Sequence, residues 1–198
     1  MKNLHKLFLF IATIFLFASC AEPVTIETLL NEMTDRDALP QKSPASFTAA
    51  QFSSYDRRSK TPGNDDWFAN DDNNTYMRTE QHGDRKERVM MDTTGPGAIV
   101  RFWMTFAGDL KVSGQGKLRI YIDGQETPAY ECSAFDFFRK GLAGAPLVAS
   151  VSELTPFEQR GHNCYFPIPY AKRCKITYEP APGECVYYNI GFRTYTSP

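Results

Sequence analysis

Apolar and polar residues alternate with a period of two over most of the chain. In the clearest example, Leu118, Ile120 and Ile122 alternate with polar or amphipathic neighbours, and Asp123-Gly124 follows as a hairpin turn signal. The segments that predict strands are 88–92, 98–106, 117–123, 173–178 and 186–193. Of these, 98–106 is almost wholly apolar, which is typical of a strand covered on both faces. The pattern predicts an all-β fold, a single antiparallel jelly-roll-like β-sandwich.

A helical period appears once, near the start of the chain. Thr25 is a candidate N-cap, and the apolar residues that follow it are spaced at i, i+3, i+4 and i+7. These apolar residues are Ile26, Leu29, Leu30 and Met33. We expect one short N-terminal helix that ends before Pro40, followed by a polar linker over 41–44.

The first residues predict a lipoprotein signal. Lys2 and Lys6 precede an apolar run over 7–17, which is shorter than the roughly 20 residues that a spanning helix needs. Residues 17–20 resemble a bacterial lipobox that ends in Cys20, the expected site of lipid attachment; the alternative is a plain signal peptide with an incidental cysteine. We expect a signal peptide over 1–19, an anchor, helix and linker over 20–44, and the sandwich over 45–198. This places the protein in the bacterial cell envelope, held to a membrane by its lipid.

Charge and composition exclude two classes of protein. The 198 residues contain 22 Lys+Arg and 23 Asp+Glu, so no broad basic surface is available and nucleic-acid binding through bulk charge is not expected. Aromatic residues make up 14% of the chain, which supplies ample apolar area for a core and excludes a disordered chain.

Cysteine spacing leaves two interpretations open. Four cysteines follow Cys20, and they allow three disulfide pairings or four small buried thiols, of which we favour the thiols. They are Cys132, Cys164, Cys174 and Cys185. None of them forms a pair at two-residue spacing, and His162 is the one imidazole nearby, so zinc is poorly supported. Asp71 and Asp72 lack the ligand spacing of a calcium loop, and we expect neither a metal nor a cofactor.

The densest polar stretch, 53–72, has the composition of a sugar site. Carboxylates, amides and guanidinium groups bind hydroxyls, and the apolar face of a sugar ring packs on an aromatic side chain. The candidate substrate-binding residues are Tyr55, Asp56, Arg57, Asn64, Asp65 and Trp67. The structural alternative is that Asp56 pairs with Arg57 and that the rest is a solvated turn.

Six motifs in this order resemble one known family. They are Ser54-Tyr55-Asp56-Arg57, Gly63-Asn64-Asp65-Asp66, the strand 95–105, the strand 118–124, Phe166-Pro167-Ile168-Pro169-Tyr170 and Tyr187-Tyr188-Asn189-Ile190. The series resembles the N-terminal half of the domain of unknown function 2961 family, glycoside hydrolase family 172. The resemblance implies two tandem jelly rolls, oligomeric assembly and retaining hydrolysis of arabino- or fructofuranosides by two glutamates.

The resemblance does not assign catalytic residues within this sequence. The family's glutamate pair is expected in the second jelly roll, beyond residue 198, and no motif gives Glu80, Glu87, Glu153 or Glu158 that role. We therefore expect a half-enzyme that is inactive alone and binds a furanose-containing glycan as a homo-oligomer or with a separately encoded second half. The alternative is a non-catalytic carbohydrate-binding or assembly lipoprotein.

Overall fold

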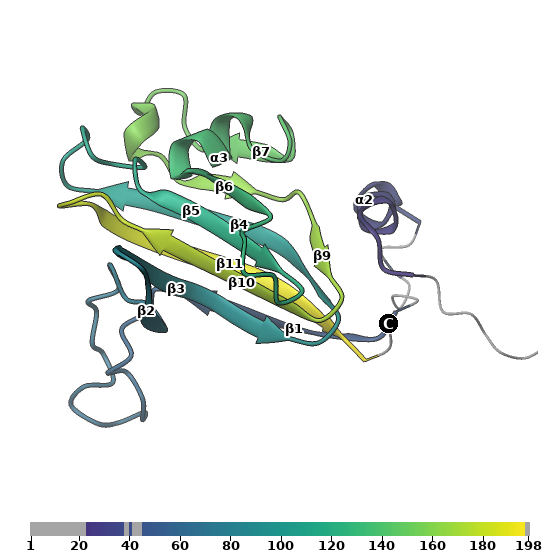
Figure 1. Ribbon diagram of the computed structural model, residues 1–198, viewed down its shortest axis with the longest axis horizontal. Helices are drawn as coiled ribbons and strands as arrows, with labels where there is room; N and C mark the ends of the chain where they lie inside the picture. The colour runs from purple at the N-terminus through teal and green to yellow at the C-terminus, as the bar shows by residue number, and fades with distance from the viewer. Residues whose placement is uncertain (1–22, 38–39, 41–44, 197–198) are drawn as a thin grey trace, which may run out of the picture.

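The computed structural model describes residues 23–37, 40 and 45–196, so the predicted signal segment, Cys20 and the linker 41–44 lie outside the described residues. Two antiparallel sheets face each other (Figure 1). Sheet A has the order β1 (Phe47–Ser53), β11 (Cys185–Tyr195), β4 (Gly97–Ala107), β8 (His162–Cys164) and β7 (Val148–Ser150), with β9 (Ile168–Tyr170) also on β4. Sheet B has the order β2 (Arg78–His82), β3 (Arg85–Thr94), β10 (Arg173–Glu179), β5 (Lys117–Ile122) and β6 (Tyr130–Ser133). The predicted β-sandwich is confirmed.

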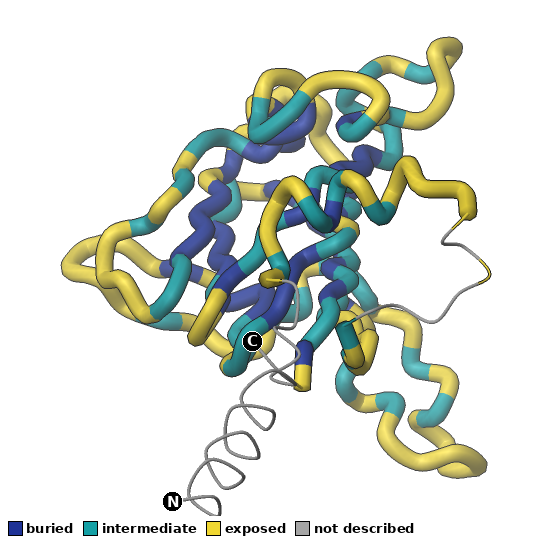
Figure 2. The backbone as a smooth tube through the Cα atoms, turned by 90° about the vertical axis from the view of Figure 1, so that its right-hand side faces the viewer, coloured by how far each residue is buried: buried dark blue, intermediate teal, exposed yellow. Residues whose placement is uncertain are grey.

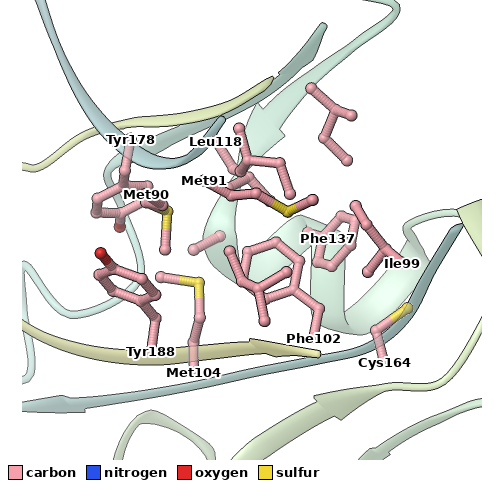
Figure 3. Close-up of a cluster of buried hydrophobic side chains, with 14 of the residues drawn as sticks. Met90, Met91, Ile99, Phe102, Met104, Leu118, Phe137, Cys164, Tyr178 and Tyr188 are labelled. Carbon is pink, nitrogen blue, oxygen red and sulfur yellow. The ribbon is translucent and has the colours of Figure 1, made fainter. Parts of the chain in front are cut away.

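The core lies between the two sheets because alternate residues of each strand point inward. Phe102 and Met104 of β4 meet Leu118 of β5 and Tyr178 of β10, and all four side chains are at most 1% exposed (Figure 3). Figure 2 shows the same division along the chain, with buried residues concentrated in the strands and exposed residues in the loops. The alternation read from the sequence therefore corresponds to the inner and outer faces of the sandwich.

The helix α2 (Ile26–Thr34) covers one end of the outer face of sheet A. Thr25 caps it as predicted, since its Oγ1 accepts a hydrogen bond from the N–H of Thr28 at 3.2 Å. Leu29 packs with Ala98 and Tyr195, which belong to a small cluster separate from the main core. No helix among the described residues is long and apolar enough to cross a membrane.

This helix explains why only part of β4 is buried on both faces. Ala98 and Ile99 are at most 1% exposed, as expected for the apolar run. From Arg101 onward the outward residues are half-buried or exposed, because α2 does not extend over them. The expectation of a strand covered on both faces is correct for the first residues of β4 and wrong for the rest.

A second short helix was not predicted. The helix α3 (Ala134–Lys140) connects β6 to β7 and buries four apolar residues, among them Phe135 and Phe137. Ser133 is its N-cap, and its Oγ accepts a hydrogen bond from the N–H of Asp136 at 3.1 Å. A 3₁₀ turn, η2 (Phe157–Gln159), follows β7. The expectation of a single helix is therefore corrected to two among the described residues, and the buried side of α3 packs into the main core.

The four cysteines of the sandwich are free thiols. Cys164 and Cys174 are buried, while Cys132 and Cys185 are half-buried. Burial raises the pKa of the Cys174 thiol to about 12, which keeps it protonated and unreactive. Of the two interpretations left open by the sequence, the structure supports free thiols, although only Cys164 and Cys174 are buried as expected.

His162 lies in an aromatic cage near α3. It is fully buried beside Phe138 and Phe157, whose ring centroids are 5.4 Å and 4.5 Å from its own, and its Nδ1 lies 2.8 Å from Ser150 Oγ. Burial, together with the positive charges of Arg139 and Arg160, lowers its pKa to about 4. The imidazole is therefore neutral in the folded protein at physiological pH.

In the unfolded chain His162 binds a proton near pH 6.5. The contribution of its neutral form to the free energy of unfolding is therefore fully present above that pH and is lost as the pH falls toward 4. Between pH 8 and pH 5 we expect His162 to account for a loss of about 2 kcal/mol in the free energy of unfolding. Denaturant unfolding of the wild type and of His162→Phe at both pH values measures this loss. The variant is expected to lack it, and His82→Asn at an exposed position is the control that keeps it.

Candidate functional site

The polar loop predicted to hold the site joins the edge strand of one sheet to the edge strand of the other. It leaves β1 after Ser53 and reaches β2 at Arg78, and Figure 1 shows it projecting beside β2. Ser54 fixes its start, since Ser54 N–H donates to the carbonyl of Tyr188 and Tyr188 N–H donates to Ser54 Oγ, each at 3.1 Å. The loop is thereby tied to β11 before it turns outward.

The carboxylate of Asp56 organises the loop. Only 5% of this residue is exposed, and its oxygens accept hydrogen bonds from the backbone N–H groups of Arg58 and Asp71, both at 3.0 Å. The guanidinium of Arg58 adds contacts to both oxygens through Nε, at 3.0 Å and 3.1 Å. The N–H of Asp56 in turn donates to Asp72 Oδ1 at 2.7 Å. One carboxylate therefore connects the two ends of the loop.

The pairing differs from the structural alternative raised by the sequence, because Asp56 pairs with Arg58 and not with Arg57. The side-chain hydrogen bond from Arg58, followed by its backbone N–H, holds the pKa of Asp56 well below the usual range. Asp56 is thus ionised with both oxygens occupied by donors. It is neither a proton donor nor a free nucleophile, and its contribution to a site is to position its neighbours.

Arg57 and Tyr55 form a second contact beside this anchor. The guanidinium of Arg57 lies 4.9 Å from the centroid of the Tyr55 ring and donates to the carbonyls of Tyr55 and Ser53, both at 3.3 Å. Tyr55 as a whole remains 52% exposed. The pair presents an aromatic face backed by a positive charge to solvent.

The remaining predicted residues lie in the turn that follows. The N–H of Trp67 donates to the carbonyl of Asn64 at 3.0 Å, which closes the turn and leaves the Asn64 and Asp65 side chains exposed. Trp67 is half-buried, whereas the neighbouring Phe68 is 85% exposed. The hydroxyl of Ser59 donates a hydrogen bond to the carbonyl of Ala69 at 3.1 Å, which joins this turn to the segment that follows Asp56.

The structure adds a row of residues that the sequence analysis did not assign to the site. The register aligns Ser53 of β1 with Asn189 of β11, Asn189 with Trp103 of β4, and Trp103 with Asn163 of β8. Their neighbours along each strand, such as Phe102, are in the core, so this row lies on the outer face of sheet A. The row begins at the residue that precedes the loop.

Polar and aromatic groups meet in this row. Asn163 Oδ1 accepts from Arg101 Nη2 at 3.3 Å and from the Tyr165 hydroxyl at 3.4 Å. Gly161 lies directly against the indole, since a Cβ there would come within 3.0 Å of Trp103 Nε1. An indole beside amides and a guanidinium suits a sugar ring and its hydroxyls. Polar breaks in the apolar run 98–106, at Arg101 and Thr105, were the signal that one face of this strand lies outside the core.

The two buried glutamates that the structure describes hold the interior of the sandwich together. Burial raises the pKa of Glu184, but this residue is 5% exposed and accepts from the Tyr178 hydroxyl and the Ala181 N–H, each at 2.9 Å, within the sandwich. Burial also acts on Glu87, but hydrogen bonds from Thr177 and Tyr121 leave its pKa lowered. In the part of the chain that the structure describes, no group of three or more His, Cys, Asp or Glu side chains is arranged to hold a metal.

Together, the two antiparallel sheets and the edge loop define a β-sandwich domain with a polar and aromatic surface on sheet A. Residues 45–198 match the family model described as the GH172 first beta-sandwich domain, so the chain belongs to the GH172 family. The family resemblance read from the six motifs is confirmed. Comparison with curated proteins found no match.

Replacing Asp56 tests whether its carboxylate holds the loop. In Asp56→Asn we expect the amides of Arg58 and Asp71 to exchange with deuterium at least about tenfold faster, because each loses a hydrogen bond to a charged acceptor. Hydrogen–deuterium exchange followed by mass spectrometry measures this change. Asp65→Asn makes the same change of charge at an exposed position and is expected to leave both amides unchanged. Equal exchange rates of the Arg58 and Asp71 amides in the two variants would contradict this role of Asp56.

Proposed function

We propose that this chain is the sugar-binding first sandwich of an envelope glycoside hydrolase that acts with retention on arabino- or fructofuranosides. The observation that carries the proposal is the Asp56-held loop, which continues into the Trp103 row of sheet A in a member of the GH172 family. Membership supports an activity related to glycoside hydrolysis, and the choice of furanosides rests on the motif resemblance.

In this proposal most of the residues contact the sugar, while Asp56 positions them. Trp67 and Trp103 supply apolar surface for the faces of sugar rings, while Asn64 and Asp65 contact hydroxyl groups. Arg57 and Tyr55 add a guanidinium stacked on an aromatic ring to the same loop. Asp56 holds this arrangement without contacting the sugar, which is consistent with its burial and its occupied oxygens.

A partner supplies the reacting carboxyls in this proposal. A retaining enzyme holds two carboxyls about 5–5.5 Å apart, one of them an acid with a raised pKa. The one described carboxyl with a raised pKa that lies in a strand connection, Glu184, is enclosed by Tyr178 and Gly116. A second sandwich, in a further segment or in an associated chain, therefore completes the site, and a homo-oligomer is one way to bring it there.

A second candidate function is a carbohydrate-binding or assembly module without catalysis. The half-buried Trp103 and Asn189 on the outer face of sheet A favour it, since an indole beside an amide binds a glycan without any acid. The two candidates share the same sugar contacts and differ in whether a partner's carboxyls act on the bound glycan.

Calorimetric titration with arabinan and fructan oligosaccharides tests the shared sugar contact. We expect the full chain to bind one of these glycans and Trp67→Ala to bind it roughly tenfold more weakly, because an aromatic platform is lost. Phe68→Ala removes the adjacent, more exposed ring and is the matched control, expected to bind like the wild type. Binding that Phe68→Ala weakens as strongly as Trp67→Ala contradicts the assignment of the platform.

We also propose that Cys20 carries the lipid that holds the chain to the envelope. In cells fed a radiolabelled or alkyne fatty acid, we expect the wild type to be labelled and to sediment with membranes. Cys20→Ala is expected to lose both properties, because the acyl chains that give stable anchoring are attached to Cys20 in this proposal. Cys132→Ala is the control, and label that persists in Cys20→Ala contradicts lipid attachment at this residue.

A further inference from the structure

The outer face of sheet B carries a dense network of charged side chains. Along β10 the residues that alternate with the core positions Cys174 and Ile176 are polar, and they include Arg173 and Lys175. Arg173 binds Asp92 through Nε and Nη2, at 2.8 Å and 2.7 Å. The opposite edge of this guanidinium, at Nη1, therefore faces away from Asp92.

Cations outnumber carboxylates at one end of this network. Glu80 accepts from Lys175 Nζ at 2.7 Å and from Arg78 Nε at 2.9 Å, and its Oε2 lies 3.3 Å from His82 Nε2. Asp92 is shared by Arg173 and Arg78. Three permanent cations thus share two carboxylates, with an imidazole as a further donor, and Glu126 in the lining of the cavity is a third carboxylate. The cationic groups of Arg173 and Lys175 are the contacts for an anionic ligand.

A cavity of about 460 Å³ opens at this end of the sheet. Its lining comes from the end of β2, from β5 and the turn that follows it, and from β10: His82, Tyr121, Gly124, Gln125, Glu126, Arg173 and Lys175. The ammonium of Lys175 lies 4.7 Å from the centroid of the Tyr121 ring, which fixes both side chains at the cavity. The volume falls within the range of about 300–1,000 Å³ that is typical of small-molecule sites.

The turn after β5 gives the cavity a preformed rim. Asp123 and Gly124 both have positive φ, at 56° and 82°, and the N–H of Gln125 donates to the carbonyl of Ile122 at 3.1 Å. This confirms the turn predicted from Asp123-Gly124. Asp123 Oδ1 also accepts from the N–H groups of Ala171 and Lys172, at 2.9 Å and 2.6 Å, which ties the rim to the start of β10.

The chemistry of the lining selects a ligand that is more than a simple anion. Arg173 and Lys175 favour a carboxylate, whereas the exposed Glu126 on the rim repels one and accepts hydrogen bonds from hydroxyls. Gln125 donates and accepts with its amide. We infer that this cavity is a binding site for a sugar acid, with the carboxylate at Arg173 and Lys175 and the ring hydroxyls at Gln125 and Glu126.

This site is separate from the Asp56 loop and does not rest on the function proposed for that loop. The loop reaches sheet B at Arg78, and β2 then runs five residues to His82 at the cavity. None of the residues assigned to the loop site lines the cavity, although Arg78, where the loop ends, shares Asp92 with Arg173. The two sites can therefore be tested independently on one chain.

Calorimetric titration of the full chain with galacturonate and glucuronate tests the inference. We expect one of these sugar acids to bind at least about tenfold more tightly than galactose, glucose or acetate, because only the sugar acid satisfies both halves of the cavity. Arg173→Gln is expected to weaken binding at least about tenfold. Lys172→Gln makes the same change of charge at the adjacent exposed residue and is expected to bind within about twofold of the wild type.

A second variant guards against effects of Arg173→Gln on the fold. Gln125→Ala changes an exposed turn residue and is expected to weaken sugar-acid binding several-fold while leaving the thermal unfolding of the chain unchanged. Equal affinity for acetate or inorganic phosphate and the sugar acids overturns the inference, as does equal weakening by Arg173→Gln and Lys172→Gln. Absence of sugar-acid binding overturns it as well, including a case where light scattering shows that a second copy covers this face. None of these results bears on binding of neutral furanosides at the Asp56 loop.

Discussion

The antiparallel pairing of β4 with β11 is the constraint on which sheet A depends. It brings residues 97–107 beside residues 185–195, and it leaves one edge of each strand free for a further partner. β1 pairs with the free edge of β11, and β8 and β9 pair with that of β4. Because side chains alternate along these strands, the same pairing places Phe102 in the core and Trp103 on the outer face. The candidate surface therefore follows from the register of one strand pair.

Asp56 illustrates how a polar residue in a candidate sugar site serves the fold. Its two oxygens accept from the backbone N–H groups of Arg58 and Asp71 and from the guanidinium of Arg58, and these hydrogen bonds favour ionisation more than burial disfavours it. A carboxylate held in this way organises a long loop that has few apolar contacts of its own. In our proposal the loop binds a sugar with the side chains that Asp56 positions, and the reaction belongs to carboxyls from elsewhere.

Sequence patterns predicted the elements with a clear period and missed those that depend on tertiary contacts. The strands around Ile120 and Ile176 were visible because inner and outer faces differ in polarity, and α2 was visible through Thr25 and its apolar spacing. The helix α3 was missed although Ser133 caps it and Asp136, Arg139 and Lys140 form its polar face, since seven residues are too few to establish a helical period in the sequence.

The candidate site was predicted as a segment, while its internal arrangement was not. The loop residues were identified from composition, but the partner of Asp56 is set by a turn in which its carboxylate accepts from the backbone two residues on, which favours Arg58 over Arg57. Trp103 was predicted to lie in a strand but was not assigned to the site. The sequence pattern does not reveal which part of the outer face α2 covers. Charge sharing around Arg173 was likewise hidden, since Asp92 and Glu80 lie 81 and 95 residues from their partners on β10.

The measurement that tests the account most directly is turnover of nitrophenyl arabinofuranosides and fructofuranosides by the purified chain. The account predicts that the chain alone releases nitrophenol no faster than buffer, because its sandwich binds the sugar and a partner supplies the two reacting carboxyls. Sustained release by the chain alone, abolished when one of its own glutamates is changed to glutamine, contradicts the account.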